Sequence, residues 1–191
     1  MTRAPVRVAV LISGTGSNLR ALVEASEPAF EIALVLSNRA EAPGLAWAAE
    51  RGIATVALPH APYGKDRQAH EAALDEALRA HDIAVVALAG YMRVLTPWLV
   101  GRWSGRMLNI HPSLLPRYPG LDTHRRALEA GDPEAGCTVH LVSEGVDEGP
   151  ILDRARVPVM AGDTPETLAA RVLEAEHRLY PQALGRFCAG L

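Results

Sequence analysis

Short apolar runs rich in β-branched residues alternate with longer segments of helical periodicity through the first half of the chain. The strand-like runs and helix-like segments follow one another in the order 8–12, 19–25, 32–36, 45–51, 56–58, 67–80 and 83–88. Strands that alternate with helices form parallel sheets, because each helical crossover returns the chain to the same end of the sheet. We therefore predict an α/β fold with a doubly wound, mostly parallel sheet, helices on both faces, and ligands beyond the carboxyl ends of the strands.

The second half departs from this alternation. A strand-like run at 107–110 ends at Pro112 and leads into a proline-rich loop over 112–120. Two further strand-like runs, 137–142 and 151–159, flank an acidic turn, so a hairpin and a crossover both fit and mixed strand direction is expected here. A final helix should begin at Asp163-Thr-Pro-Glu166, which resembles a capping box, and run to about Tyr180. Without repeats or linkers, residues 1–191 are predicted to form a single domain.

Composition excludes several classes of function. Nineteen basic and twenty-two acidic residues give a net charge of -3, and no run of like charges is suited to a nucleic-acid backbone. Apolar runs are too short to cross a membrane. The only cysteines, Cys137 and Cys188, have neither disulfide density nor CxxC spacing, and no HExxH motif is present. We expect a cytoplasmic protein that binds no nucleic acid, membrane or metal.

A turn of small residues, Ser13-Gly-Thr-Gly-Ser-Asn-Leu19, lies directly between a predicted strand and a predicted helix. Glycines allow close approach of the backbone, and the free N–H groups of a helix N-terminus bind phosphate. Ser17 and Asn18 could add side-chain donors. Leu19 replaces the third glycine of the dinucleotide fingerprint, and the Walker ending is missing, so both nucleotide motifs are incomplete. The alternative is a tight turn in which Ser17 or Asn18 only caps the helix.

Asn109 and His111 point to the same face of their predicted strand, since side chains alternate along a strand. An amide donor beside an imidazole suits addition to a carbonyl, where negative charge develops on oxygen. Asp147, in the glycine-rich acidic turn, would raise the pKa of His111 and transfer protons if it lay beside that ring. The alternatives are a structural Asn-x-His at a strand end and a solvated turn aspartate.

Two further polar residues could be structural or functional. Glu176 lies at the edge of an apolar stripe on the last helix, where carboxylates usually point outward, although it could face a ligand hydroxyl or amine. His140 shares a strand face with Thr138 and Val142, and we favour a core position over a supporting role in a site.

Five ordered segments resemble the phosphoribosylglycinamide formyltransferases, a folate-dependent family. They are Leu11-Ile-Ser-Gly-Thr-Gly-Ser-Asn-Leu19, Leu88-Ala-Gly-Tyr-Met-Arg-Val-Leu95, Leu108-Asn-Ile-His-Pro-Ser-Leu-Leu-Pro116 with Tyr118-Pro-Gly120, Val146-Asp-Glu-Gly-Pro150, and Glu176-His177. The resemblance implies a Rossmann-like fold, and transfer of a formyl group from 10-formyltetrahydrofolate to the amine of glycinamide ribonucleotide in purine (IMP) biosynthesis. It leaves open a monomer or a homodimer.

The resemblance also implies roles for particular residues. Asn109 and protonated His111 would hold the oxyanion, and Asp147 would keep the imidazole charged. The N-terminal half would bind the substrate phosphate and the C-terminal half would bind folate and carry out catalysis. The residues implied for the ribonucleotide are Gly16, Ser17, Asn18 and Glu176. Those implied for folate are Arg67, Met92, Arg93, Val94, Leu95, Asn109, Ser143, Glu144, Gly145, Val146 and Asp147.

Two positions depart from the family pattern. Thr15 stands where relatives carry Asn or Arg, and Leu173 stands where a polar residue often helps to hold the ribonucleotide. Both departures bear on substrate affinity.

Three alternatives compete with this interpretation. A formyltetrahydrofolate hydrolase would use the same Asn-His-Asp chemistry with water as the acceptor and would not need the phosphate turn. A methionyl-tRNA formyltransferase would need an additional domain for tRNA and a surface that binds it. A nucleotide-binding module or a dinucleotide-dependent dehydrogenase could share the wound sheet, although Leu19 argues against both.

Overall fold

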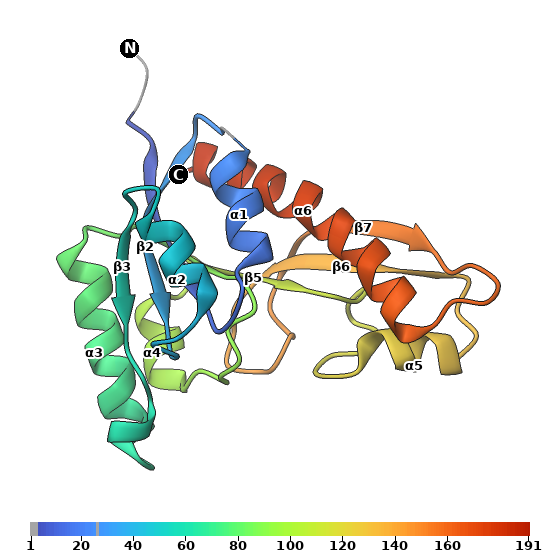
Figure 1. The fold of residues 1–191 in the computed structure, drawn as a ribbon, viewed down its shortest axis with the longest axis horizontal. Coiled ribbons are helices and arrows are strands. Elements are labelled where there is room, and N and C mark those ends of the chain that lie inside the picture. The colour runs from blue at the N-terminus through green and yellow to red at the C-terminus, as the bar shows by residue number, and fades with distance from the viewer. Residues whose placement is uncertain (1–3, 26) are drawn as a thin grey trace.

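The structure is a computed structural model that describes residues 4–25 and 27–191. Its centre is a seven-stranded sheet in the order β3-β2-β1-β4-β5-β6-β7 (Figure 1). The first five strands are parallel, and β6 and β7 are antiparallel, so the prediction of a mostly parallel sheet with mixed direction near the C-terminus is confirmed. The strands are β1 (Val6–Ile12), β2 (Phe30–Ser37), β3 (Ala54–Ala57), β4 (Val85–Leu88), β5 (Met107–His111), β6 (Glu134–Leu141) and β7 (Ile151–Pro158).

Helices cover both faces of the sheet, as predicted. Along β1, Val8 and Val10 pack into one apolar cluster with helices α1, α2 and α6, whereas Ala9 and Leu11 pack into the other with α3 and α4. This alternation follows from the two-residue period of a strand. The helices are α1 (Ser17–Glu24), α2 (Pro43–Ala49), α3 (Arg67–Ala80), α4 (Pro97–Arg102), α5 (Thr123–Glu129) and α6 (Pro165–Ala189), with a 3₁₀ turn η1 (Ala61–Tyr63). Among the described residues, no helix is both long and apolar enough to cross a bilayer.

The C-terminal strands form a hairpin, which decides between the two connections that the sequence left open. β6 pairs antiparallel with β7, and residues 142–150 join them. β6 also pairs antiparallel with β5, which sets Asn109 opposite His140 and His111 opposite Thr138. The register of this one strand pair therefore brings two imidazoles and an amide to the same end of the sheet.

Helix α6 begins at Pro165, within the predicted segment, but its capping residues and its C-terminal end differ from the prediction. The capping box that begins it joins Thr164 and Thr167, whereas the side chain of Asp163 accepts from Arg171 and from the N–H of Met160. The helix then continues through Pro181 to Ala189, well past the predicted end near Tyr180. Its apolar face packs against α1, β6 and β7 along this length (Figure 1), and this packing outweighs the local cost of the proline.

The strand order reverses between β1 and β4, which are neighbours in the sheet but lead to opposite sides of it. Loops that follow such a pair diverge and leave a crevice at the carboxyl ends of the strands. Ser13, directly after β1, ties these loops together because its hydroxyl donates to Asn38 Oδ1 (2.5 Å) and accepts from the Met92 N–H (2.8 Å). The segment after β1 and the segment after β4 are thus held side by side.

Asp75 joins α3 to α4 on the opposite face from α6. The carboxylate is 4% exposed and accepts from Arg79 Nε, Arg102 Nε and Trp103 Nε1, each at 2.9 Å. Burial alone would raise the pKa of Asp75, but these three donors outweigh it and hold the pKa below the usual value of 3.8. The ionised carboxylate is therefore part of the folded state at neutral pH.

We expect Asp75→Asn to lower the free energy of unfolding by about 2 kcal/mol, because one charged acceptor for three donors is lost. A lowered pKa stabilises the folded state above the unfolded pKa, and this contribution is lost as pH falls through the folded value. The difference between wild type and variant should therefore shrink as the pH falls below 3.8. Urea unfolding at several pH values measures this, and a pH-independent difference would contradict it.

Candidate active site

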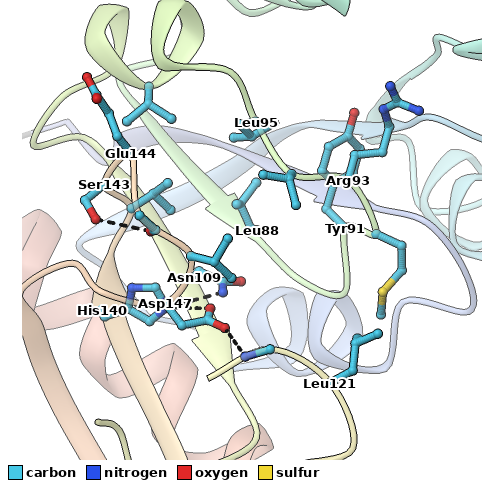
Figure 2. Close-up of a pocket in the computed structure, with 17 residues that line it drawn as sticks. Leu88, Tyr91, Arg93, Leu95, Asn109, Leu121, His140, Ser143, Glu144 and Asp147 are labelled. Atoms are coloured by element: carbon cyan, nitrogen blue, oxygen red, sulfur yellow. Dashed lines mark hydrogen bonds and ion pairs between the residues drawn. The ribbon is translucent and has the colours of Figure 1, made fainter. Parts of the chain in front are cut away.

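A cavity of about 620 Å³ opens at the carboxyl ends of β4 and β5 (Figure 2). One wall is the segment that follows β4, and the other is the turn between β6 and β7. Ten of the eleven residues that the sequence predicted for folate line it, Arg67 being the exception: Met92, Arg93, Val94, Leu95, Asn109, Ser143, Glu144, Gly145, Val146 and Asp147. Leu88, Tyr91, Val100, Gly120, Leu121, His140 and Val142 complete the lining.

Arg67 is exposed and does not line the cavity. It is the first residue of α3, and its Nη2 donates to the main-chain carbonyl of Val94. In this structure its guanidinium therefore supports the wall from outside the lining.

Asn109, His140 and Asp147 meet at the floor of the cavity, as Figure 2 shows. Asn109 Nδ2 lies 3.3 Å from His140 Nε2, which lies 3.5 Å from Asp147 Oδ1. His140 Nδ1 is 2.9 Å from the carbonyl of Leu141, and because a carbonyl only accepts, Nδ1 carries the proton. In the neutral ring, Nε2 then accepts from the Asn109 amide and orients it.

The sequence underestimated His140. The side chain is 2% exposed, as expected for a core position, but its Nε2 faces two polar groups of the cavity. His140 faces the cavity because it is the cross-strand partner of Asn109, and the register of β5 and β6 sets this pairing.

His111 lies beside Asp147 as the sequence required, with 3.3 Å between Nδ1 and Asp147 Oδ2. Its Nε2 donates to the carbonyl of Tyr118 (2.8 Å), and the ring is 5% exposed and outside the cavity lining. Burial lowers the pKa of His111, and the Tyr118 carbonyl and the Asp147 carboxylate oppose this only in part. The sequence predicted that Asp147 would raise the pKa of His111. The net shift is downward instead, because desolvation of the imidazolium outweighs the attraction of Asp147.

Asp147 remains ionised at neutral pH. Burial raises its pKa, but the neighbouring imidazoles of His140 and His111 and the hydrogen bond from the Gly120 N–H (2.9 Å) outweigh burial and lower the pKa below its usual value. The residue has φ 56° and so lies in the left-handed region, which orients the side chain toward both histidines. It is not the solvated turn aspartate that the alternative supposed.

The proline-rich loop supplies main-chain hydrogen-bonding groups to the site, a role that its sequence did not reveal. It presents the Tyr118 carbonyl to His111 and the Gly120 N–H to Asp147. The Tyr118 hydroxyl donates to Asp132 Oδ2 (2.7 Å), and Ser113 Oγ donates to the Arg117 carbonyl (2.6 Å), which anchors the loop. Backbone groups carry no signature in residue type, so only the prolines and Gly120 hinted at a special conformation.

The glycine turn leads into α1 without a side-chain cap. Gly16 is the N-cap, with φ 73°, and within the described part of the chain no side-chain cap hydrogen bond is made at this helix end. The simple capping alternative for Ser17 or Asn18 is therefore wrong, and the N–H groups at this helix end are left without a capping side chain. Gly44 packs closely behind the turn, because its N–H donates to the Gly14 carbonyl at 3.1 Å.

Asn18 and Glu176 meet although they are 158 residues apart. Asn18 Nδ2 donates to Glu176 Oε2 (2.8 Å), and the two side chains are 8% and 7% exposed. Burial raises the pKa of Glu176, and the bond from Asn18 reverses only part of that. The Glu176 carboxylate does not point outward, so the prediction from the apolar stripe, that a carboxylate there points to solvent, is wrong for this residue. Leu173, one turn earlier, is 36% exposed.

No group of three or more His, Cys, Asp or Glu side chains within residues 4–25 and 27–191 is arranged to hold a metal ion.

Comparison with known proteins places this site in a family. Residues 6–184 match the family model described as formyl transferase. Phosphoribosylglycinamide formyltransferase from Escherichia coli (strain K12) is 45% identical over 188 residues, with 97% of this chain and 88% of that protein covered. The crystal structure of phosphoribosylglycinamide formyltransferase from Brucella melitensis superposes with a TM-score of 0.92 at 54% identity, covering 98% of this chain and 97% of that one.

Some relatives are much longer. The trifunctional purine biosynthetic protein adenosine-3 of Drosophila pseudoobscura pseudoobscura is 46% identical over 189 residues, which are 96% of this chain, and the chain spans 14% of that protein's length.

A doubly wound sheet with a cavity at the carboxyl ends of its strands, lined by apolar side chains around a few convergent polar groups, defines an α/β enzyme that acts on small molecules. The chain belongs to the formyl transferase family, as its five motifs predicted. That family implies a folate-derived formyl donor, and membership excludes the dehydrogenase alternative.

Proposed function

We propose that the protein transfers the formyl group of 10-formyltetrahydrofolate to the amine of glycinamide ribonucleotide, forming formylglycinamide ribonucleotide and tetrahydrofolate in purine biosynthesis. The observation that carries this proposal is the cavity in which Asn109 and Asp147 lie beside the predicted folate wall. Its volume of about 620 Å³ is suitable for a small cofactor-sized ligand. The reaction needs no metal, membrane or nucleic acid, and we place it in the cytoplasm, in a monomer or a homodimer.

The two substrates approach from different loops. The folate occupies the cavity between the segment after β4 and the β6–β7 turn, with its formyl group at Asn109. The phosphate of the ribonucleotide binds the free N–H groups at Gly16 and Ser17. A second cavity of about 640 Å³ shares Met92, Gly120 and Leu121 with the first, and Met92 is bonded to Ser13 beside the glycine turn. This continuity supports a path for the amine to the formyl carbon.

The chemistry is addition followed by elimination. The amine nitrogen attacks the formyl carbon, and the carbonyl electron pair moves onto oxygen to form a tetrahedral intermediate. One N–H of Asn109 is oriented by His140, and the other donates to that oxygen. The oxyanion then re-forms the carbonyl as the bond from carbon to the folate nitrogen breaks. The proton lost by the amine passes to the departing nitrogen, with Asp147 as the carrier.

His111 takes part after a change of hydrogen-bond partner. Its Nε2–H is bonded to the Tyr118 carbonyl, so it exchanges this acceptor for the oxyanion during the reaction. Negative charge on the oxyanion and on Asp147 then favours the imidazolium, which offsets the cost of burial.

An assay of folate product with and without glycinamide ribonucleotide tests this function. We expect formation of tetrahydrofolate only when the ribonucleotide is present, with one formylated amine for each folate released. Equal folate release in water alone would instead identify a formyltetrahydrofolate hydrolase and overturn the proposal.

Asn18→Ala should raise the KM for glycinamide ribonucleotide by about tenfold, because the variant loses the amide proposed to bind this substrate and leaves Glu176 without its donor. The kcat should change by less than about threefold, since neither residue contacts the reacting carbonyl. Steady-state kinetics with each substrate varied in turn measures both values. A selective rise in the KM for the folate would contradict the assignment.

A further inference from the structure

Helix α3 holds the cavity wall at two points. Arg67 donates to the carbonyl of Val94. One turn further along α3, Glu71 accepts from the N–H of Thr96 (2.8 Å) and also from its hydroxyl. Residues four apart lie on the same face of a helix. The two side chains therefore hydrogen-bond to the main chain on either side of Leu95, which lines the cavity.

The contact between Glu71 and Thr96 departs from two local preferences, because it buries a carboxylate and uses a threonine that would otherwise cap a helix. Its carboxylate is 4% exposed, and a buried carboxylate is unfavourable unless it is well bonded. Thr96 is the N-cap of α4, yet its side chain makes no capping bond and donates to Glu71 instead. A threonine hydroxyl at this position ordinarily accepts from the first turn of its helix. Departures from local preference of this kind concentrate where function constrains the structure.

We propose that Glu71 is a positioning residue for the folate: through Thr96 it sets how far Leu95 extends into the cavity, without contacting the ligand. This inference rests on the proposed function, since it assigns the ligand of that cavity. Loss of Glu71 leaves the Thr96 N–H without its acceptor and frees the wall to shift. The affinity for folate then falls, while the reacting groups at Asn109 and Asp147 keep their places.

The same helix provides a matched control. Asp75 is one turn beyond Glu71 and is also 4% exposed. Its partners are Arg79, Arg102 and Trp103, none of which lines the cavity. Asp75→Asn therefore perturbs α3 without releasing the wall, which separates positioning of the ligand from general stability.

The experiment measures the Kd of tetrahydrofolate by calorimetry, together with kcat and the KM of each substrate. We expect Glu71→Ala to raise the Kd and the folate KM by about tenfold, with kcat and the ribonucleotide KM within about twofold of wild type. Thr96→Val, which removes only the hydroxyl bond, should raise the Kd by about threefold. Asp75→Asn should lower Tm and leave the Kd within about twofold.

A Kd for Glu71→Ala within about twofold of wild type would overturn the inference, as would an equal loss of affinity in Asp75→Asn. If Glu71→Ala does not fold, the comparison of Thr96→Val with Asp75→Asn decides in the same way. Failure of the wild type to bind tetrahydrofolate would instead refute the proposed function. The two ideas are thus tested separately.

Discussion

Replacing Asp147 by Asn should lower kcat by at least about a hundredfold. The carboxylate faces both imidazoles, with Oδ2 at 3.3 Å from His111 Nδ1 and Oδ1 at 3.5 Å from His140 Nε2. Asparagine has nearly the same shape but no charge, so it can neither accept the amine proton nor favour the imidazolium of His111. Because burial already lowers the pKa of His111, the ring depends on this charge when it donates to the oxyanion.

The neighbouring Glu148 offers a matched control, because it lies on the same turn and is exposed. Glu148→Gln should retain kcat within about twofold, since a solvated carboxylate outside the cavity contributes little. Single-turnover rates at saturating substrate, with circular dichroism to verify the fold, provide the comparison. Near-normal turnover in Asp147→Asn would show that Asp147 does not carry the proton and would contradict the proposed mechanism.

Asn109→Ala should also reduce kcat by at least about a hundredfold, because one preorganised donor to the oxyanion is lost. The amide meets the formyl oxygen most strongly when that oxygen carries charge, so the loss should appear in kcat and kcat/KM together. The folate KM should stay within about threefold of wild type, since the cavity wall is unchanged. A variant that loses affinity for folate but keeps its turnover would show that Asn109 only binds substrate.

Asn109→Asp separates hydrogen-bond donation from packing. Aspartate preserves the volume of the side chain, but it supplies no N–H at neutral pH and adds a second negative charge near Asp147. It should be at least as inactive as Asn109→Ala. Recovery of activity in Asn109→Asp would mean that filling the site matters more than donating to the oxyanion.

The elements that could be predicted from sequence are those determined by local periodicity. α3 was predicted over Arg67–Ala80 and has these bounds, because its apolar residues recur at helical spacing and Asp66 caps it. The parallel strands follow from their runs of apolar residues. The end of α6 was wrong because tertiary packing carries the helix past Pro181.

Within the site, the sequence could identify side chains but not their partners. It placed Asn109, His111 and Asp147 together through the family motifs, and the geometry brings His111 and Asp147 within 3.3 Å. It missed the contribution of His140, because only the register between β5 and β6 sets this ring opposite Asn109. It also missed the Tyr118 carbonyl, because a backbone acceptor has no signature in residue type.

The sequence by itself determined the alternating architecture, the glycine turn and the identity of the polar residues, because each of these follows from local spacing and residue chemistry. Only the tertiary structure decided that the net pKa shift of His111 is downward, that Glu176 is buried against Asn18, and that α3 grips the cavity wall through Glu71. Burial and hydrogen bonding between distant segments set these properties, and both depend on how the whole sheet and its helices pack.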